Sequence, residues 1–314
     1  MAAANPPRLS IGLPVYNGER YLRFAIDSIL SQTYGDFELL INDNASTDTT
    51  GLICQEYASR DPRVRYFRNV ENVGAAANFN MVFERARGEY FKWAAADDVI
   101  SPTFLEACMN VLERDPSVVL AYSRVDRIDS SGKIDGTYDY PMRVDSPDAA
   151  TRFRDLILVN HFCVAVFGIV RREVLAQTPL IGKFVGSDRV LLAELGLRGR
   201  MCEISEYLFH RRDHPQTSGR AFDIYKRLAW FDPTKKRSIN LVYWRVGTEY
   251  LKAIFRVPMP LKQRLAAMRP LARWFIFRRR WLVEDIKAAI IQIMPFSKQI
   301  VQMARKPHNE NKSS

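Results

Sequence analysis

Cysteine is scarce in this chain, and the few cysteines present are not spaced for chemistry. Four occur in 314 residues, at Cys54, Cys108, Cys163 and Cys202, each in an apolar or helical stretch. They lack both the paired spacing of zinc ligands and the density of a disulfide-stapled secreted domain. We therefore expect reduced thiols and a cytoplasmic protein.

Targeting and membrane-spanning signals are missing too. Residues 1–20 do not combine a basic start with a long apolar segment, so we expect no secretory signal. Residues 288–294 are apolar but too short to span a bilayer. No G-x-G-x-x-G follows the first apolar run, residues 9–16, which argues against a dinucleotide-dependent oxidoreductase.

Acidic charge is sparse in the C-terminal third. Residues 211–314 hold 23 Lys or Arg against 7 Asp or Glu, a balance of +16 within a whole-chain charge of +11. The first 210 residues hold the other 23 basic and 28 acidic groups, a balance of −5. A negatively charged partner should therefore be sought at the C-terminal third.

The N-terminal part alternates between short apolar runs and helical patterns. A hydrophobic content of 47% with 26% charged residues is typical of a globular protein. The order strand, helix, strand, helix predicts an α/β fold with right-handed parallel crossovers. We expect the first strand to end at Pro14, which has no N–H for ladder pairing. The expected strands are residues 9–16, 37–41, 64–67 and 88–96, and the expected helices are 21–32, 49–60 and one opening at Gly74.

Acidic residues follow two of these strands directly. Asp43 comes after residues 37–41, and Asp97 with Asp98 after residues 88–96. Ligands of open α/β sheets bind beyond the carboxyl ends of the strands. Adjacent carboxylates repel unless N–H donors or a hard cation such as Mg²⁺ or Mn²⁺ compensates them. A capped turn at Asp43 and an acidic N-cap at Asp98 remain the alternatives.

The second part continues with strands at residues 118–122, 162–170 and 201–209, a hairpin turn at 126–133, and a polar, proline-containing loop at 138–150. Asp188 begins an apolar helix, as an N-cap or as a general base. Arg211 and His214 follow the last strand, and from the residues alone they belong to a solvated surface.

Several separated motifs resemble glycosyltransferase family 2 in order and spacing. They are residues 14–17, 25–34, 42–48, 72–74 with Asn78, and 96–98. The resemblance covers about the first 120 residues. It implies a GT-A fold, a nucleotide-sugar donor, most simply a UDP-sugar, and inversion at the anomeric carbon.

The resemblance also implies roles for single residues. It places Pro14, Tyr16 and Glu19 at the walls of the nucleotide pocket, Asp43 on the base, Asn78 at the donor, Asp97 and Asp98 at sugar and metal, Asp188 as general base, Arg211 at the diphosphate, and His214 at the diphosphate or the metal. Many members have a carboxylate where this chain has Ala95. Which of Asp97 and Asp98 touches the metal is therefore open.

Residues 271–282 interleave aromatic side chains with arginines. This composition suits the interface of an anionic membrane. Packed helices with solvated basic faces and, less favoured, nucleic-acid binding are the alternatives. We expect three parts: residues 1–120 for the nucleotide sugar, 121–222 for acceptor and base, and 223–314 as a basic helical C-terminal region.

The sequence therefore predicts an inverting glycosyltransferase that uses Mn²⁺ or Mg²⁺. The expected acceptor is a hydroxyl of a lipid-linked or cell-envelope glycan at the inner face of the plasma membrane, with no nucleic-acid partner. One rival is a nucleotide-sugar-binding protein that lost catalysis, for which Ala95 is the motive. A second rival is a nucleic-acid-binding protein led by the basic region.

Overall fold

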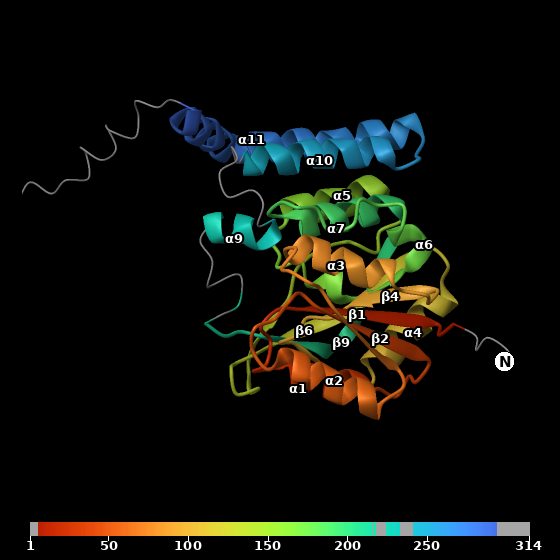
Figure 1. Ribbon diagram of the computed structural model, residues 1–314. Helices are drawn as coiled ribbons and strands as arrows, with labels where there is room; N and C mark the ends of the chain where they lie inside the picture. Colours follow the sequence, from red (N-terminus) through yellow and green to blue (C-terminus); the bar gives the residue numbers. More distant parts are fainter. Residues whose placement is uncertain (1–5, 216, 218–223, 233–240, 294–314) are drawn as a thin grey trace, which may run out of the picture.

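The computed structural model describes residues 6–215, 217, 224–232 and 241–293. Its elements are stacked in layers (Figure 1). Helices α1 (Leu22–Leu30) and α2 (Thr50–Arg60) cover one face of a central sheet, and α3 (Ala75–Glu84) covers the other. Beyond α3 come two further helical layers, so the sheet is buried on both faces.

One sheet runs through the protein in the order β3-β2-β1-β4-β8-β6-β9-β5, with β7 paired to β6. The first four strands are parallel: β1 (Leu9–Val15), β2 (Phe37–Asp43), β3 (Val64–Arg68) and β4 (Tyr90–Trp93). Every residue of β1 and β2 is buried, which is why these strands read as mostly apolar runs without a polar face. The predicted α/β class and the parallel order of the first half are confirmed.

The prediction that the first strand ends at Pro14 is wrong. Pro14 pairs with Asn42 inside β1, and the strand continues to Val15. The ladder between β1 and β4, however, ends at Gly12 opposite Trp93. Because β4 has already left the ladder there, the missing N–H of Pro14 costs little.

The second half of the sheet mixes directions. Strand β6 (Val118–Ile128) pairs in parallel with β9 (Arg200–Arg212) and antiparallel with β7 (Ile134–Tyr138), and β9 pairs antiparallel with β5 (Val99–Ile100). The expected turn at 126–133 is shorter, because β9 holds β6 in the sheet as far as Ile128. The Asp129 N–H donates to the Lys133 carbonyl to close the turn, and Gly132 has a φ of 92°. The expected boundary at residue 120 falls inside β6.

The expected strand at 162–170 is mostly wrong. Residues Val164–Phe167 form a short 3₁₀ helix, η1, and only Ile169–Arg171 is a strand, β8. Cys163, before η1, has a left-handed φ of 56°, which breaks any extended run. The apolar, β-branched pattern of this segment reflects burial rather than strand geometry.

His161 holds this turn in place. Its Nε2–H donates to the Leu156 carbonyl at 3.0 Å, and its Nδ1 accepts from the Cys163 N–H at 3.1 Å. Burial and the nearby Arg189 lower the pKa of His161 to about 4. The neutral ring is therefore the form that fits, since a proton on Nδ1 would displace the Cys163 N–H.

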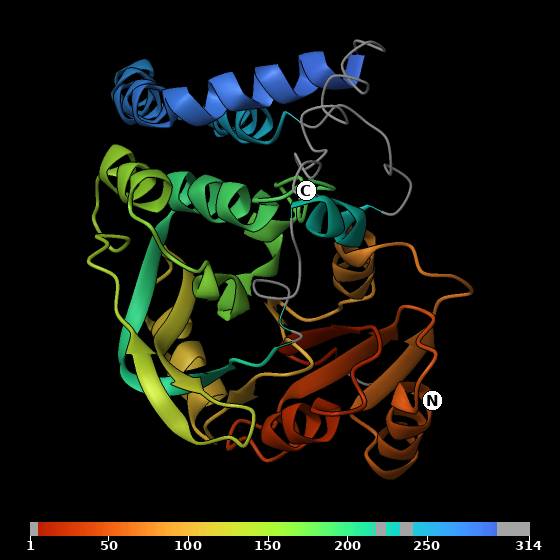
Figure 2. The ribbon, with the colours of Figure 1, turned by 90° about the vertical axis from the view of Figure 1, so that its left-hand side faces the viewer.

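The remaining helices other than α4 (Phe104–Arg114) lie on the side of the sheet that α3 covers. They are α5 (Ala149–Leu158), α6 (Arg172–Leu175), α7 (Ser187–Arg198), α9 (Ile224–Phe231), α10 (Val242–Arg256) and α11 (Leu261–Ile293). Figures 1 and 2 both show α10 and α11 as a hairpin beyond α5 and α7. Among the described helices, none combines the length and the apolar character that a bilayer crossing requires.

An ion-pair cluster ties this hairpin to α7. Glu194 of α7 is fully buried and pairs with Arg198 at 2.8 Å and with Arg256 of α10. Most of α7 is buried, because α5 and α10 both pack on it. The helix that begins with Asp188 is therefore fixed from both sides.

Removing the acid of this cluster should destabilise the protein strongly. Glu194→Ala leaves two arginines without their buried partner, so we expect the free energy of unfolding to fall by about 3–5 kcal/mol. Urea denaturation followed by circular dichroism measures it. Glu284→Ala, which removes an exposed pair with Lys287, is the matched control and should cost about 0–1 kcal/mol. Equal losses in the two variants would contradict the assignment.

His161 should make stability depend on acid. Its folded pKa of about 4 lies below the ordinary 6.5, so between these values the unfolded chain binds a proton that the folded chain does not. Stability is then full above pH 6.5 and falls as the pH drops toward 4, by about 3 kcal/mol. His161→Gln should flatten this part of the stability curve relative to the unchanged protein in urea titrations. Parallel curves would overturn the explanation.

Candidate functional site

The loops that follow β1 and β2 are joined by hydrogen bonds. The Asn17 N–H donates to Ser46 Oγ at 2.9 Å, and the Thr49 N–H donates to a Glu19 carboxylate oxygen at 3.0 Å. Pro14 is buried in β1, whereas Tyr16, just after it, is 46% exposed. The parallel strands thus bring Tyr16 and Glu19 to the same edge as Asp43.

Asp43 is the buried end of β2. Its carboxylate accepts from the Ser46 N–H at 2.8 Å, from Tyr66 Oη at 3.0 Å and from Arg68 Nη1 at 2.6 Å. The side chain is fully buried, and Arg68 neutralises it. The sequence-based prediction for Asp43 did not include Arg68, which lies on β3 beside it and already occupies one carboxylate oxygen, Oδ2.

Asn78 lies in a network of asparagine side chains. It accepts from Asn42 Nδ2 and donates to the Asn42 carbonyl at 3.0 Å, and it is 3% exposed. Asn69 donates to both Asn78 and Asn44. The amide of Asn78 therefore ties α3 to the end of β2, and its predicted contact with a donor stays a prediction.

The loop after β4 meets the end of β9. Asp97 Oδ2 lies 3.0 Å from His214 Nε2, and Asp98 Oδ1 accepts from the Arg212 N–H at 2.8 Å. The Arg212 side chain donates through Nε to the Asp97 carbonyl. The His214 ring lies 4.8 Å from Tyr21, which follows the β1 loop. The structure therefore brings the predicted Asp97, Asp98 and His214 together beside the β1 loop.

The two adjacent carboxylates have different environments. The Asp97 side chain is 34% exposed, while Asp98 as a residue is 9% exposed. Burial, and then the neighbouring Asp97 charge, raise the pKa of Asp98 to about 8. Asp97 is therefore the carboxylate that an incoming ligand or cation can reach.

Asp97 and His214 are chemically suited to bind a divalent cation that takes only some of its ligands from the protein. Within the described residues, no three His, Cys, Asp or Glu side chains are arranged to hold a metal ion by themselves. Mg²⁺ and Mn²⁺ commonly use one or two carboxylates and complete their ligands with water and substrate phosphates. Asp97 with His214 fits that pattern.

Arg211 and Arg212 point to different places, as successive residues of a strand do. Arg212 lies over the Tyr21 ring at 4.7 Å, on the side of Asp97. Arg211 donates to Tyr138 Oη at 2.8 Å and lies 5.0 Å from the Phe162 ring. The sequence-based prediction named Arg211 and missed Arg212. It is Arg212 that contacts the acidic motif, by which we mean Asp97 and Asp98.

A buried lysine lies under the acidic motif. Lys92 of β4 is 1% exposed, and its Nζ donates to the carbonyls of Trp93 and Phe167. Burial lowers its pKa to about 8. Lys92, Ala95 and Asp98 line one small hollow. No sequence motif identifies Lys92 as a residue of this region. The one signal in the sequence is its position inside a strand that is expected to be buried.

Asp188 is in the first turn of α7, and its carboxylate lies against Cys163. Burial and this neighbouring carboxylate raise the pKa of the Cys163 thiol. Phe162, directly before Cys163, is 59% exposed and packs against Tyr138 with ring centroids 5.1 Å apart. Arg211 contacts both of these rings. The end of β9 thus connects two parts of the candidate site. Arg212 contacts Asp97 and Asp98, and Arg211 contacts Phe162 in the segment beside Asp188.

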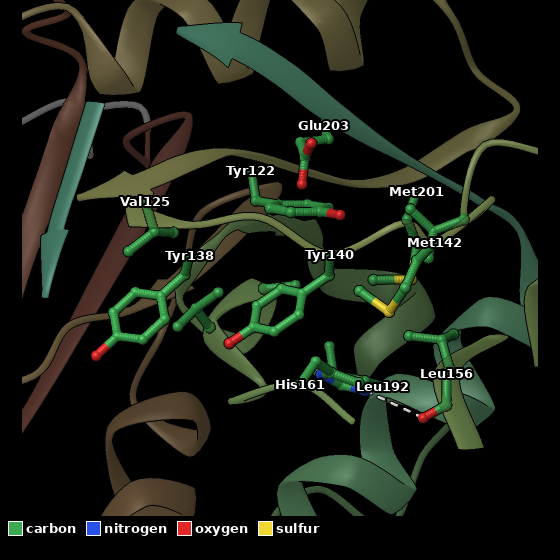
Figure 3. A pocket seen from close by; sticks show the side chains of 13 residues that line it. Tyr122, Val125, Tyr138, Tyr140, Met142, Leu156, His161, Leu192, Met201 and Glu203 are labelled. Atoms are coloured by element: carbon green, nitrogen blue, oxygen red, sulfur yellow. Dashed lines mark hydrogen bonds between the residues drawn. The ribbon is translucent and has the colours of Figure 1, made fainter. Parts of the chain in front are cut away.

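A small hollow lies next to Tyr138, which forms an aromatic cluster with Phe162 (Figure 3). The rings of Tyr138 and Tyr140 border it, with Tyr122 and Glu203 on one side and His161 opposite. Its free interior has room for about one water molecule. It is therefore too small for a sugar, and the exposed ring of Phe162 is the part of the cluster that an incoming molecule can touch.

Comparison with solved structures supports the architecture. Staphylococcus aureus TarS, residues 1–349, in complex with UDP-GlcNAc, superposes with a TM-score of 0.56 at 14% sequence identity, covering 94% of this chain and 92% of that one. A likeness at this identity concerns the fold alone, and it confirms the expected GT-A fold.

Sequence relatives match part of the chain. An uncharacterised glycosyltransferase of Rickettsia typhi is 37% identical over 124 residues, 39% of this chain and 38% of that protein. Chondroitin synthase of Escherichia coli is 34% identical over 137 residues, 43% of this chain and 20% of that protein. The match thus spans well under half the length of either relative. The model of Glycosyl transferase family 2 matches residues 10–178, more than half of the chain, and on this ground the protein belongs to glycosyltransferase family 2.

Proposed function

We propose that this protein is a nucleotide-sugar-dependent glycosyltransferase that acts with inversion. The observation that carries the proposal is the end of β9, where Arg212 contacts the acidic motif while its neighbour Arg211 contacts the aromatic segment beside Asp188. Family membership supports the reaction class. A donor held at the β1, β2 and β4 loops would then face an acceptor held beside α7.

The proposed chemistry assigns one task to each group. The acceptor hydroxyl attacks the anomeric carbon, its proton passes to Asp188, and the nucleoside diphosphate leaves with the bonding electron pair. Phe162 offers an exposed ring on which an acceptor sugar can stack. Arg212, which contacts Asp97 and Asp98, would offset the charge that develops on the leaving diphosphate.

Asp97 and His214 would hold the divalent cation, with Asp98 behind them. A bound Mn²⁺ or Mg²⁺ supplies positive charge to the diphosphate oxygens. The protein's own part is to keep Asp97 oriented, through the bond from Arg212 Nε to its carbonyl and the contact with His214. Asp98, hydrogen-bonded to the Arg212 N–H, anchors the loop from beneath.

We propose a UDP-sugar as the donor and a lipid-linked or cell-envelope glycan as the acceptor. The donor proposal is supported by the fold shared with TarS, a protein crystallised with UDP-GlcNAc. The acceptor proposal is supported by the basic C-terminal third, which suits a reaction at the inner face of the plasma membrane. The three-part division at residues 120 and 222 belongs to this proposal.

A nucleotide-sugar-binding protein without catalysis is the second candidate. Ala95 favours it, because the hollow that it lines with Lys92 and Asp98 has an alanine where the resemblance to the family leads us to expect a carboxylate. In that protein the donor would still bind at the Asp43 and Asp97 loops. Transfer of sugar is the property that separates the two candidates.

Donor binding should raise the melting temperature in a cation-dependent way. A panel of nucleotide sugars, each with and without Mn²⁺, should contain a class that stabilises the protein by about 2–3 kcal/mol at a hundredfold excess over Kd. Asp97→Ala should remove the Mn²⁺-dependent part of the shift. Thermal-shift assays measure both. If no nucleotide sugar changes the melting temperature, the donor site is wrongly assigned.

Asp188→Asn should lower the transfer rate by about two to four orders of magnitude, because an amide cannot take the acceptor proton. Donor affinity should stay unchanged, since Asp188 lies beside Cys163 and not at the acidic motif. Coupled release of nucleoside diphosphate in the presence of acceptor measures the rate. Glu89→Gln, an exposed residue paired with Arg8, is the control. Full activity in Asp188→Asn would exclude it as the base.

A further inference from the structure

Helix α11 has two faces with opposite environments. Ala267, Leu271, Trp274 and Leu282 are buried against α10 and α5. Gly247 of α10 allows the close approach, because a Cβ there would lie 2.7 Å from Phe275 and 2.9 Å from Trp274. One face of α11 is thus committed to the protein, and the opposite face is left to the surroundings.

That opposite face carries an apolar stripe. The stripe consists of Leu261, Leu265, Ile276, Val283 and Ile290, with exposed fractions of 68%, 58%, 57%, 48% and 49%. Successive members are four, eleven, seven and seven residues apart, and each of these spacings is close to a whole number of helical turns. Large apolar side chains that line up on an outer surface mark an interaction site more strongly than scattered ones do.

Cations border the stripe. On helical spacing, Lys262, Arg269, Arg273, Arg279, Arg280 and Lys287 fall beside it, and all are exposed. The helix as a whole has eight Lys or Arg against two acidic residues. Glu284 pairs with Lys287, and Asp285 instead accepts from the Tyr243 and Trp244 N–H groups of α10. Most of the positive charge therefore has no acidic partner on this helix.

The hairpin is fixed, so the stripe cannot turn inward. Trp244 Nε1 donates to the Leu282 carbonyl at 3.0 Å, and Tyr243 stacks on Trp281 with ring centroids 5.5 Å apart. On the other side, Arg256 of α10 pairs with the buried Glu194 of α7. Figures 1 and 2 show the hairpin as the outermost layer of the molecule.

We propose that this face, defined by the five stripe residues and their six flanking cations and here named the α11 outer face, binds flat on the surface of an anionic lipid bilayer. The apolar side chains enter the headgroup boundary while the guanidinium and ammonium groups contact lipid phosphates. The inference concerns a surface apart from the donor site and does not depend on the proposed reaction.

Charge decides between this occupant and two others. A second copy of the chain would bring the same cations against each other, which opposes a symmetric dimer through this face. A nucleic acid would use the cations but leave the apolar stripe in water. An anionic bilayer uses both components at once.

Vesicle sedimentation with the full chain tests the proposal. The protein should pellet with vesicles of equal parts phosphatidylcholine and phosphatidylglycerol, and far less with phosphatidylcholine alone. Arg279→Ala with Arg280→Ala should lower the partition coefficient about thirtyfold, from about 1 kcal/mol for each charge. Ile276→Gln with Val283→Gln should lower it at least about tenfold.

The matched control is a double substitution on α2, away from the α11 outer face. It replaces one apolar and one basic residue that are about as exposed as the stripe residues and their cations. Leu52 and Arg60 are 68% and, for the side chain, 71% exposed, and Leu52→Gln with Arg60→Glu should bind vesicles as the unchanged protein does. Circular dichroism melts should show that all variants fold, which their exposure favours. Donor-induced thermal shifts should be the same in all of them, so failure here is distinguishable from failure of the proposed function.

Four results would overturn the proposal. The first is no binding of the unchanged protein to anionic vesicles, and the second is binding that the α11 variants leave unaltered. The third is a mass by light scattering that corresponds to a dimer and returns to a monomer in Ile276→Gln with Val283→Gln, which would assign the face to a second copy. Binding of duplex DNA in place of vesicles, lost in Arg279→Ala with Arg280→Ala, would equally reject the bilayer.

Discussion

The backbone hydrogen bond from Arg212 to the Asp98 carboxylate is the contact on which the candidate site depends. Asp98 is buried next to another carboxylate, and such a group persists only with a donor beside it. Strand β9 supplies that donor because it pairs with β5 directly after the acidic motif. The same pairing brings the Arg212 guanidinium and His214 to Asp97.

The parallel strands supply the rest of the site. Because β1 pairs with β2 on one side and β4 on the other, the loops after all three strands lie at one edge of the sheet. The loops are then tied to each other, as the bond from Asn17 to Ser46 shows. A donor binding there would meet a rigid surface rather than separate mobile loops.

The C-terminal helices belong to the same packing unit as the candidate base. Glu194 lies two turns after Asp188 on α7 and pairs with Arg256 of α10. The orientation of α7 therefore depends on α10, and α10 is in turn held by α11. The α11 outer face and the helix that carries the candidate base Asp188 are thus linked through direct contacts of α10.

Some of this was determined by the sequence alone. The alternating runs predict the parallel strands, and short-range motifs such as residues 42–48 and 96–98 identify the family, because strand periodicity and loop chemistry are local properties. Pro14 and residues 162–170 were misjudged, since a strand's end depends on its neighbours and burial alone produces the same apolar pattern as a strand. The tertiary structure alone decided that Arg212 and not Arg211 contacts the acidic motif, that Asp97 is more accessible than Asp98, and that Arg68 and Lys92 lie beside the predicted carboxylates. All of these findings depend on strand register or on burial across the sheet. Register and burial arise from contacts between distant segments, so no single stretch of residues encodes them.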